Sequence, residues 1–343
     1  MENVEEKMKQ INGERARLAP KLPLKEPFSI SVTTANVCNL ECEFCAISEK
    51  GRARNKSLMD IETFKIFIDS VNKAEWHLKQ IVLVGLGEPL VNPNIVEFVK
   101  MIKKANIAEK VHIVTNAVNL NKNMAEELIE AGLDVLRVSL NGLSDEDYVR
   151  YTNKKVDFNK LVEQIRYFHD KALNTKIYIK IMDYMVDSDD KLLFFKNLFE
   201  PISTVCNVEY LTEMSTTLDY NQVSKETKKK GLKGFELAET EICPLPFYHI
   251  YLNAEGTISA CCVAGPWSTP PALVMGDLHE ESINDIWNGK RFNEFFISML
   301  KYGKNCANET CKGCKAYLSY IYPEDIIEED EARRICTILE GKR

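Results

Sequence analysis

The sequence predicts an α/β fold in which a partial (β/α)6 barrel is followed by a small α+β domain with a β-hairpin. Runs of β-branched residues alternate with amphipathic stretches from residue 28 to residue 211, which is typical of a parallel sheet with right-handed crossovers. The pattern changes after Leu211, and two short strands later flank a turn. Six strand–helix units are too few for a complete eight-stranded barrel, so we expect an open barrel with its chemistry at the carboxyl ends of the strands.

Each expected element follows from its own residue pattern. The expected strands are rich in β-branched residues, and they are Phe28–Thr34, Gln80–Leu86, Lys110–Thr115, Val135–Leu140, Thr175–Met182 and Val205–Leu211. The expected helices have apolar residues three and four positions apart, and they are Asp60–Asn72, Asn94–Lys104, Lys122–Ala131, Phe158–Lys171 and Asp190–Phe199. Phe247–Asn253 and Thr257–Cys262 predict the hairpin, and Ile283–Leu300 predicts an amphipathic helix. These elements divide the chain into an N-terminal helix and linker (1–27), the barrel (28–214), a second linker (215–240), the small domain (241–320) and a tail (321–343).

Composition limits the classes of partner and the compartment. The 343 residues are 45% hydrophobic and 28% charged with a net charge of −7, so bulk attraction to nucleic acid or to an anionic membrane is not expected. No apolar run approaches the roughly 20 residues of a membrane span, and the charged N-terminus lacks the apolar core of a signal peptide. We therefore expect a cytoplasmic protein, in which eleven cysteines indicate metal ligation rather than disulfides.

Three cysteines, Cys38, Cys42 and Cys45, form a C-x3-C-x2-C motif directly after the first expected strand. Three thiolates can hold a four-iron cluster and leave one iron without a protein ligand, whereas a structural cluster normally takes four. The alternatives are a zinc knuckle and buried free cysteines. Zinc sites prefer paired C-x2-C units with a second pair or histidines nearby, and the nearest histidine here is His77.

The spacing of these cysteines, with the aromatic Phe44 just before the third, resembles the signature of the radical S-adenosylmethionine (SAM) enzymes. The resemblance implies a [4Fe-4S] cluster whose open iron chelates SAM, and reductive cleavage of SAM to a 5′-deoxyadenosyl radical. It also implies the partial barrel. Phe44 is expected to shield the cluster or stack near adenine, and simple loop packing is the alternative.

Motifs at two further strand ends fit the same resemblance. Gly87-Glu88-Pro89 resembles the family segment in which main-chain and Glu groups receive the SAM amino group, although Leu86 replaces the preceding glycine of the commonest form. Asn116 ends the third expected strand and is a candidate for an adenosine or ribose contact, or else an ordinary turn residue.

Alternation along two strands predicts which polar side chains face the barrel interior. Arg137 and Ser139 should point inward, with Ser139 near the ribose or carboxylate of SAM. Arg137 would balance the SAM carboxylate or bind substrate, or else form an ion pair with Asp134 or Glu88. An inward lysine is costly unless it is paired or used, so Lys180 is the predicted substrate-facing catalytic residue, and a pair with a neighbouring carboxylate is the alternative.

A second cysteine set lies near the C-terminus. Cys243 and Cys261 flank the expected hairpin and Cys311-Lys312-Gly313-Cys314 is a C-x2-C pair, which together supply four thiolates for a saturated cluster or for zinc. The region resembles the SPASM and Twitch auxiliary-cluster domains, whose intervening segment matches Gly276-Asp277-Leu278 and Ile283–Trp287. Tyr320 stands where a full SPASM domain continues with cysteine, which implies a single auxiliary [4Fe-4S] cluster of the Twitch type. The roles of four other cysteines are left open, and these are Cys206, Cys262, Cys306 and Cys336.

The resemblance to one-cluster Twitch enzymes predicts a radical SAM oxidoreductase. The leading hypothesis is oxidation of a small polyol, sugar or aminocyclitol with the auxiliary cluster as electron acceptor, and Lys180, His249 and Glu88 are candidates for the base. The alternative is a maturase that modifies a ribosomal peptide, against which the short segment before the first strand counts. An electron-transfer protein without a substrate radical is a third class, disfavoured by the open-site cysteine count. A flavodoxin or ferredoxin is the expected reductant.

Overall fold

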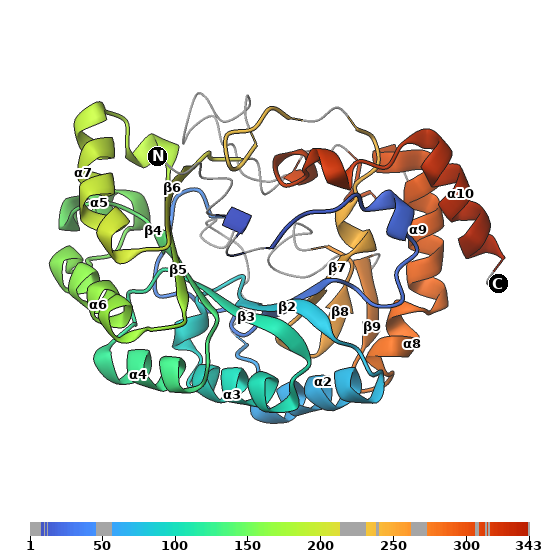
Figure 1. The fold of residues 1–343 in the computed structure, drawn as a ribbon, viewed down its shortest axis with the longest axis horizontal. Helices are drawn as coiled ribbons and strands as arrows, with labels where there is room; N and C mark the ends of the chain where they lie inside the picture. Colours follow the sequence, from blue (N-terminus) through green and yellow to red (C-terminus); the bar gives the residue numbers. More distant parts are fainter. Residues whose placement is uncertain are drawn as a thin grey trace.

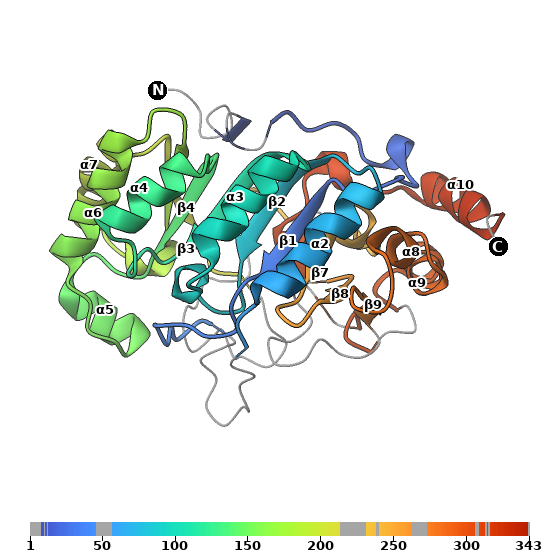
Figure 2. The same cartoon turned by 90° about the horizontal axis from the view of Figure 1, so that it is seen from below.

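The fold is built on one sheet of nine strands in the order β6-β5-β4-β3-β2-β1-β7-β8-β9. It is taken from a computed structural model that describes residues 8–9, 11, 13–45, 57–212, 231–237, 240–261, 273–305, 309–312, 314 and 316–341. The sheet curves, and helices α2, α3, α4 and α6 cover its convex face in Figure 1 and, from below, α2, α3 and α4 do so in Figure 2. The predicted α/β class with a partial barrel is confirmed.

Six strands pair in parallel, and each neighbour in the chain is also a neighbour in the sheet. They are β1 (Ser29–Thr33), β2 (Leu78–Val84), β3 (Ala108–Thr115), β4 (Val135–Leu140), β5 (Lys176–Met182) and β6 (Val205–Glu209). The crossover helices are α2 (Ile61–Lys73), α3 (Ile95–Ala105), α4 (Lys122–Glu130), α6 (Phe158–Lys171) and α7 (Asp189–Phe199). Helix α5 (Asp145–Thr152), which the sequence did not predict, follows β4 and precedes α6.

The period-two pattern of β4 separates an outer core from the barrel interior. Leu136, Val138 and Leu140 are at most 2% exposed and belong to the large core beneath the helices. Val135 belongs to a separate inner cluster with Tyr178 of β5, together with Met8, Ile11 and Val205. Side chains at alternate positions therefore point to opposite faces, as a pleated strand requires.

The C-terminal hairpin extends the barrel sheet. Strand β7 (His249–Leu252) pairs in parallel with β1, and β8 (Thr257–Ser259) returns antiparallel to it. Gly256 has φ +92, a left-handed conformation that glycine adopts without strain, and an added Cβ would lie 2.4 Å from the His279 ring. A third strand that was not predicted, β9 (Val274–Asp277), pairs with β8.

The single helix predicted over Ile283–Leu300 is wrong, because the chain forms α8 (Ile283–Trp287) and α9 (Lys290–Tyr302). Gly289 separates them with an extended backbone, and a Cβ there would lie 2.3 Å from the Asp285 carbonyl oxygen. The tail left unassigned contains α10 (Glu329–Glu340), which packs against α9.

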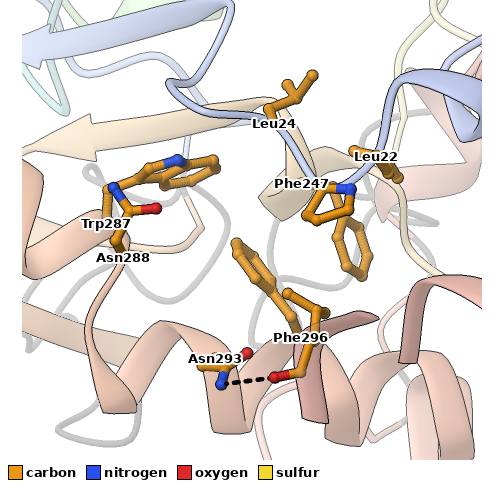
Figure 3. A pocket seen from close by; sticks show the side chains of 9 residues that line it. Leu22, Leu24, Phe247, Trp287, Asn288, Asn293 and Phe296 are labelled. Carbon is orange, nitrogen blue, oxygen red and sulfur yellow. Dashed lines mark hydrogen bonds between the residues drawn. The ribbon is translucent and has the colours of Figure 1, made fainter. Parts of the chain in front are cut away.

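The N-terminal linker rests against the C-terminal helices. Leu22 and Leu24 line a pocket with Phe247, Trp287 and Phe296, as Figure 3 shows. The linker thus lies against the short turn that precedes β7 and against α8 and α9. Within the described ranges, no helix is long and apolar enough to cross a membrane.

Most of the predicted 215–240 linker, including Lys228–Lys230, lies outside the described residues, as do Cys262 and Cys306. Of this linker the structure describes residues 231–237 and 240.

Candidate functional site

The cysteine loop leaves the carboxyl end of β1 and is held by α5. The Glu41 amide donates to the Thr152 carbonyl at 3.0 Å, and the Glu43 amide donates to the Tyr151 carbonyl at 3.0 Å. Cys45 closes the loop, since its amide donates to the Cys42 carbonyl at 3.0 Å. The helix that the sequence did not predict is therefore the support of the predicted cluster loop.

Two glycines of the segment after β2 allow this loop to pack backbone against backbone. A Cβ at Gly87 would lie 2.1 Å from the Val37 carbonyl oxygen, and one at Gly85 would lie 2.6 Å from the Ala35 carbonyl oxygen. The Gly87 amide donates to Ala35 at 2.9 Å, and the Glu88 amide donates to Val37 at 2.8 Å. Gly87 therefore supports the residues that lead into Cys38, a role that leaves no room for a side chain.

Glu88 ties the ends of β2 and β3 together. Its carboxylate accepts hydrogen bonds from the Leu90 amide at 3.0 Å, from the Asn116 amide at 2.7 Å and from the Thr115 hydroxyl. The side chain is only 3% exposed, and burial raises its pKa to about 6 although these three donors lower it. Pro89 follows as the first residue of a short 3-10 turn.

Asn116 lies beside the first cysteine. Its Nδ2 donates to Asn39 Oδ1 at 2.7 Å and is 3.9 Å from Cys38 Sγ, while its Oδ1 accepts from the Val118 amide. At the next strand end, Cys42 Sγ lies 3.4 Å from Asn141 Oδ1. The ends of β3 and β4 therefore border the cysteine loop, and the role of Asn116 in SAM binding stays a prediction.

The chemistry of the three cysteines fits a metal cluster. Burial raises the pKa of Cys38 to about 11, and burial together with the neighbouring Cys45 and Cys38 raises that of Cys42 well above its ordinary value. Such thiols stay protonated at neutral pH unless a cation stabilises the thiolates, so metal binding would release their protons. In the part of the chain described, no group of three or more ligand-type side chains converges as a single ion requires. The thiols of a four-iron cluster bind separate irons and need not meet at one point.

Phe44 packs within an aromatic group beside the loop. Its ring lies 6.4 Å from Tyr184 at 74°, and Tyr184 lies 5.5 Å from Tyr151 at 87°. These edge-on contacts are the loop packing that the sequence left as the alternative. A contact of Phe44 with a cofactor remains a prediction.

The barrel interior holds an ion pair between β5 and β6. Lys180 Nζ lies 2.7 Å from Glu209 Oε2, and the Tyr178 hydroxyl donates to Glu209 Oε1 at 2.6 Å. Burial alone would raise the pKa of Glu209, but the charge of Lys180 and these hydrogen bonds lower it below its ordinary value. The carboxylate that pairs with Lys180 is thus Glu209. Glu209 lies on the same face of β6 as Asn207, but the sequence analysis did not identify it as a site residue.

Arg137 and Ser139 lie next to this pair on β4. Ser139 is the direct partner of Lys180 in the β4–β5 register, and Arg137 is electrostatically coupled to Tyr178 and Glu209. The carboxylate of Asp134 is instead paired with Lys103 at 3.0 Å. Burial lowers the pKa of Arg137, which keeps its charge at neutral pH because a guanidinium starts so high.

The three candidate bases lie at different places. His249 Nε2 lies 3.1 Å from Ser31 Oγ and its Nδ1 contacts Ser29 Oγ, and burial lowers the His249 pKa to about 4. His249 pairs with the first residue of β1, about 13 Å along the strand from the end that carries the cysteines. Lys180, by contrast, lies near the carboxyl end of β5. Glu88, the third candidate, already accepts hydrogen bonds at both carboxylate oxygens.

The second cysteine set gathers between the hairpin and the end of α9. Burial raises the pKa of Cys243 well above its ordinary value, and the nearby Cys261, Cys314 and Cys311 raise it further. The Cys314 amide donates to the Cys311 carbonyl at 3.2 Å, which folds the C-x2-C pair into a turn. The four predicted auxiliary ligands are thus close enough to influence one another.

Comparison with known proteins gives two family matches. Residues 32–195 match the radical SAM superfamily, and residues 243–315 match the SPASM iron-sulfur cluster-binding domain. Together they include the seven cysteines of both predicted sets.

Two relatives align with most of the chain. A probable GTP 3′,8-cyclase of Methanococcus maripaludis is 31% identical over an alignment of 321 residues that covers 84% of this chain and 96% of the relative. A tungsten-containing aldehyde ferredoxin oxidoreductase cofactor-modifying protein of Pyrococcus furiosus is 24% identical over 81% of this chain and 84% of its own length.

Two solved structures share the fold. BtrN in complex with AdoMet and 2-DOIA has a TM-score of 0.54 and 18% identity, over 84% of this chain and 92% of BtrN. Streptococcus suis SuiB bound to S-adenosylmethionine has a TM-score of 0.60 and 15% identity, over 86% of this chain and 72% of SuiB.

Proposed function

Since the chain belongs to the radical SAM superfamily and carries a SPASM iron-sulfur domain, we propose that it oxidises a small polyol, sugar or aminocyclitol by a radical reaction. A cluster held by Cys38, Cys42 and Cys45 would, when bound, supply the electron that cleaves SAM to methionine and a 5′-deoxyadenosyl radical. The remaining steps depend on how the chain's own residues surround the substrate.

The observation that carries this proposal is the contact between the barrel interior and the cysteine loop. Cys42 Sγ lies 3.4 Å from Asn141 Oδ1 at the end of β4. Asn141 is two residues beyond Ser139, which is the register partner of Lys180. Farther along, the Arg15 guanidinium lies 4.0 Å from the centre of the Tyr322 ring, and both Arg15 and Cys243 affect the pKa of the half-buried Tyr248. A substrate at Lys180 would therefore lie near the radical source.

The proposed oxidation balances as a two-electron reaction. One hydrogen atom would leave a carbinol carbon to form 5′-deoxyadenosine, and the hydroxyl proton would go to a base. A cluster held by Cys243, Cys261, Cys311 and Cys314 would, when bound, accept the second electron, so that a carbonyl would form. Lys180 is the best placed of the three candidates to contact a substrate, because it lies near the carboxyl end of its strand. Its ion pair with Glu209 makes it a cation that would hold the substrate, and the hydroxyl proton would pass to a water molecule that acts as the base.

The first test is product formation from SAM. Reduced, iron-reconstituted protein should convert SAM to 5′-deoxyadenosine, and the Cys42→Ala variant should not. About eight irons per chain would support two four-iron clusters, whereas about four irons with one zinc would support a zinc site at Cys243, Cys261, Cys311 and Cys314. Equal, background-level product from wild type and variant would refute the radical reaction.

The second test separates substrate classes. Polyols and sugars deuterated at their carbinol carbons should transfer deuterium into 5′-deoxyadenosine and yield a ketone. A precursor peptide is the second candidate, because the chain shares its fold with SuiB, which has been solved bound to the precursor peptide SuiA. Deuterium transfer from a peptide, or from GTP as the name of the Methanococcus maripaludis relative suggests, would overturn the polyol assignment and leave the radical chemistry intact.

A further inference from the structure

In the part of the barrel interior that the structure describes, three cationic side chains share one carboxylate. The carboxylate of Glu209 interacts electrostatically with all three cations, which are Lys180, Lys233 and Arg137. Arg15, the next cation, has its own carboxylate in Asp325 at 2.5 Å. Glu209 is the acidic residue with the largest effect on the pKa of Lys233.

Lys233 is held there by the backbone of its own segment. The Tyr210 amide, just beyond β6, donates to the Leu232 carbonyl at 2.8 Å, and the Leu232 amide donates to the Ser319 carbonyl at 3.0 Å. Lys233 Nζ lies 6.0 Å from the centre of the Tyr178 ring, within reach of a cation–π contact. The backbone next to Lys233 is therefore anchored at both Tyr210 and Ser319, and its side chain lies near Tyr178, which donates a hydrogen bond to Glu209.

A buried imidazole supports a polar occupant of the same interior. His112 lies on the inner face of β3, where Val111 and Ile113 on either side of it belong to the outer core. It is fully buried, and neither ring nitrogen forms a hydrogen bond with any described residue. Arg137 and Lys110 lie close enough to affect its ionisation. Buried polar atoms without partners are rare in proteins and indicate that a ligand or ordered water completes the site.

Lys233 lies in a partly buried, cationic environment. Burial is the main cause that lowers its pKa to about 8, Glu209 acts in the opposite direction, and the charges of Arg137, Lys180 and Arg15 lower it further. Concentrating cations in a low-dielectric interior is unfavourable unless an anion balances them. An ammonium group, such as that of an aminocyclitol, would increase the repulsion.

We propose that Lys180 and Lys233, with Arg137 beside them, form the binding site for an anionic group, a phosphate or carboxylate, on the substrate. This inference rests on the proposed oxidation and narrows its substrate to an acidic or phosphorylated sugar or polyol. The geometry suits such a substrate, because Lys180 lies about 8 Å, Cα to Cα, from Asn141, the residue in contact with Cys42. The anionic group and the reacting carbon would thus be separated by the length of a small sugar.

The test is titration of the reconstituted full-length protein with inorganic phosphate and, separately, with acetate. Lys233→Met and Lys180→Met should each weaken phosphate binding at least about tenfold, as expected for loss of a charge-assisted hydrogen bond. Lys233→Arg should restore most of the affinity. Lys103→Met is the matched control, because Lys103 also forms an ion pair but at the opposite end of β4, with Asp134. If Lys180→Met does not fold, the Lys233 variants alone decide.

Proton uptake provides a second readout. An anion beside Lys233 raises the pKa of Lys233, so binding at pH 8 should cause this lysine to take up protons. Because the buffer supplies these protons, the measured calorimetric enthalpy of binding should differ between HEPES and Tris. Lys233→Met should abolish that difference. Binding of phosphate but not acetate assigns a phosphorylated substrate, and binding of both admits a carboxylate.

Wild-type affinity in both lysine variants, or no binding of either anion, would overturn the site. Oxidation of neutral polyols without anion binding would remove the anionic substrate class alone. Anion binding without any carbonyl product would remove the proposed oxidation alone.

Discussion

The contact between Gly87 and the cysteine loop allows a quantitative prediction. In Gly87→Ala, the new Cβ would lie 2.1 Å from the Val37 carbonyl oxygen and 2.6 Å from the Val37 amide nitrogen. Ordinary contact begins near 3.4 Å, so the loop must move by about 1.3 Å. Both partners are backbone atoms, and no side chain can rotate away to relieve the contact.

The displacement acts directly on the chain that leads into Cys38. A shift of about 1 Å in a catalytic constellation costs about 100-fold in rate, which corresponds to about 2.7 kcal/mol of activation free energy. The hydrogen bonds from Gly87 to Ala35 and from Glu88 to Val37 would stretch as well. We therefore expect Gly87→Ala to form 5′-deoxyadenosine at least about 100-fold more slowly than wild type.

The assay compares iron content and 5′-deoxyadenosine formation after identical reconstitution. Gly341→Ala is the matched control, because a Cβ at Gly341 would meet its nearest atom, the Thr337 carbonyl oxygen, at 3.5 Å. The control should keep wild-type activity. A Gly87→Ala protein within about threefold of wild-type rate would show that the loop does not depend on this contact.

Three further substitutions test the buried charges. The folded pKa of Glu88, about 6, exceeds its ordinary value of 4.5, so its contribution to stability is complete below pH 4.5 and falls by about 2 kcal/mol as the pH rises through 6. In urea unfolding, the Glu88→Gln variant should lack this loss of stability. A variant with the same pH dependence as wild type would contradict the assignment. Lys180→Met leaves Glu209 buried without its cation and should lower the free energy of unfolding by about 3–5 kcal/mol. The double variant that also carries Glu209→Gln should recover this stability. A loss below about 1 kcal/mol in Lys180→Met would argue against a buried pair. Arg15→Met removes the partner of Asp325, whose side chain is 7% exposed. It should lower the free energy of unfolding by about 1–3 kcal/mol at pH 7. An unchanged denaturation midpoint would show that this N-terminal contact is dispensable.

Local patterns were enough to predict the barrel. Strand β4 was predicted with its observed bounds because hydrophobic and polar residues alternate from Leu136 to Leu140. Both cysteine sets could be found because their spacing is a local property of the chain. The single-helix prediction over Ile283–Leu300 was wrong because the amphipathic pattern continues through Gly289, whose cost in a helix is only about 1 kcal/mol.

The interior charges depend on contacts between distant parts of the chain. The segment around Lys233 looks like a polar linker in sequence, and only its backbone bonds to Tyr210 and Ser319 bring it to Glu209. The same holds for β7, whose parallel pairing with β1 joins residues about 220 positions apart and has no short-range signal. Sequence reasoning therefore finds ligands by their spacing more readily than side chains that meet through tertiary structure.

The arrangement of these contacts gives the barrel interior a direction. Asn141 and Cys42 border one side of the Lys180–Glu209 pair, and Tyr322 with Arg15 borders the other. An anionic group anchored at Lys180 and Lys233 would fix one end of a substrate, so only carbons on the Asn141 side could approach the radical source. Charge in this interior would thus select both which substrate is held and which of its hydrogens is removed, because binding and position depend on the same lysines.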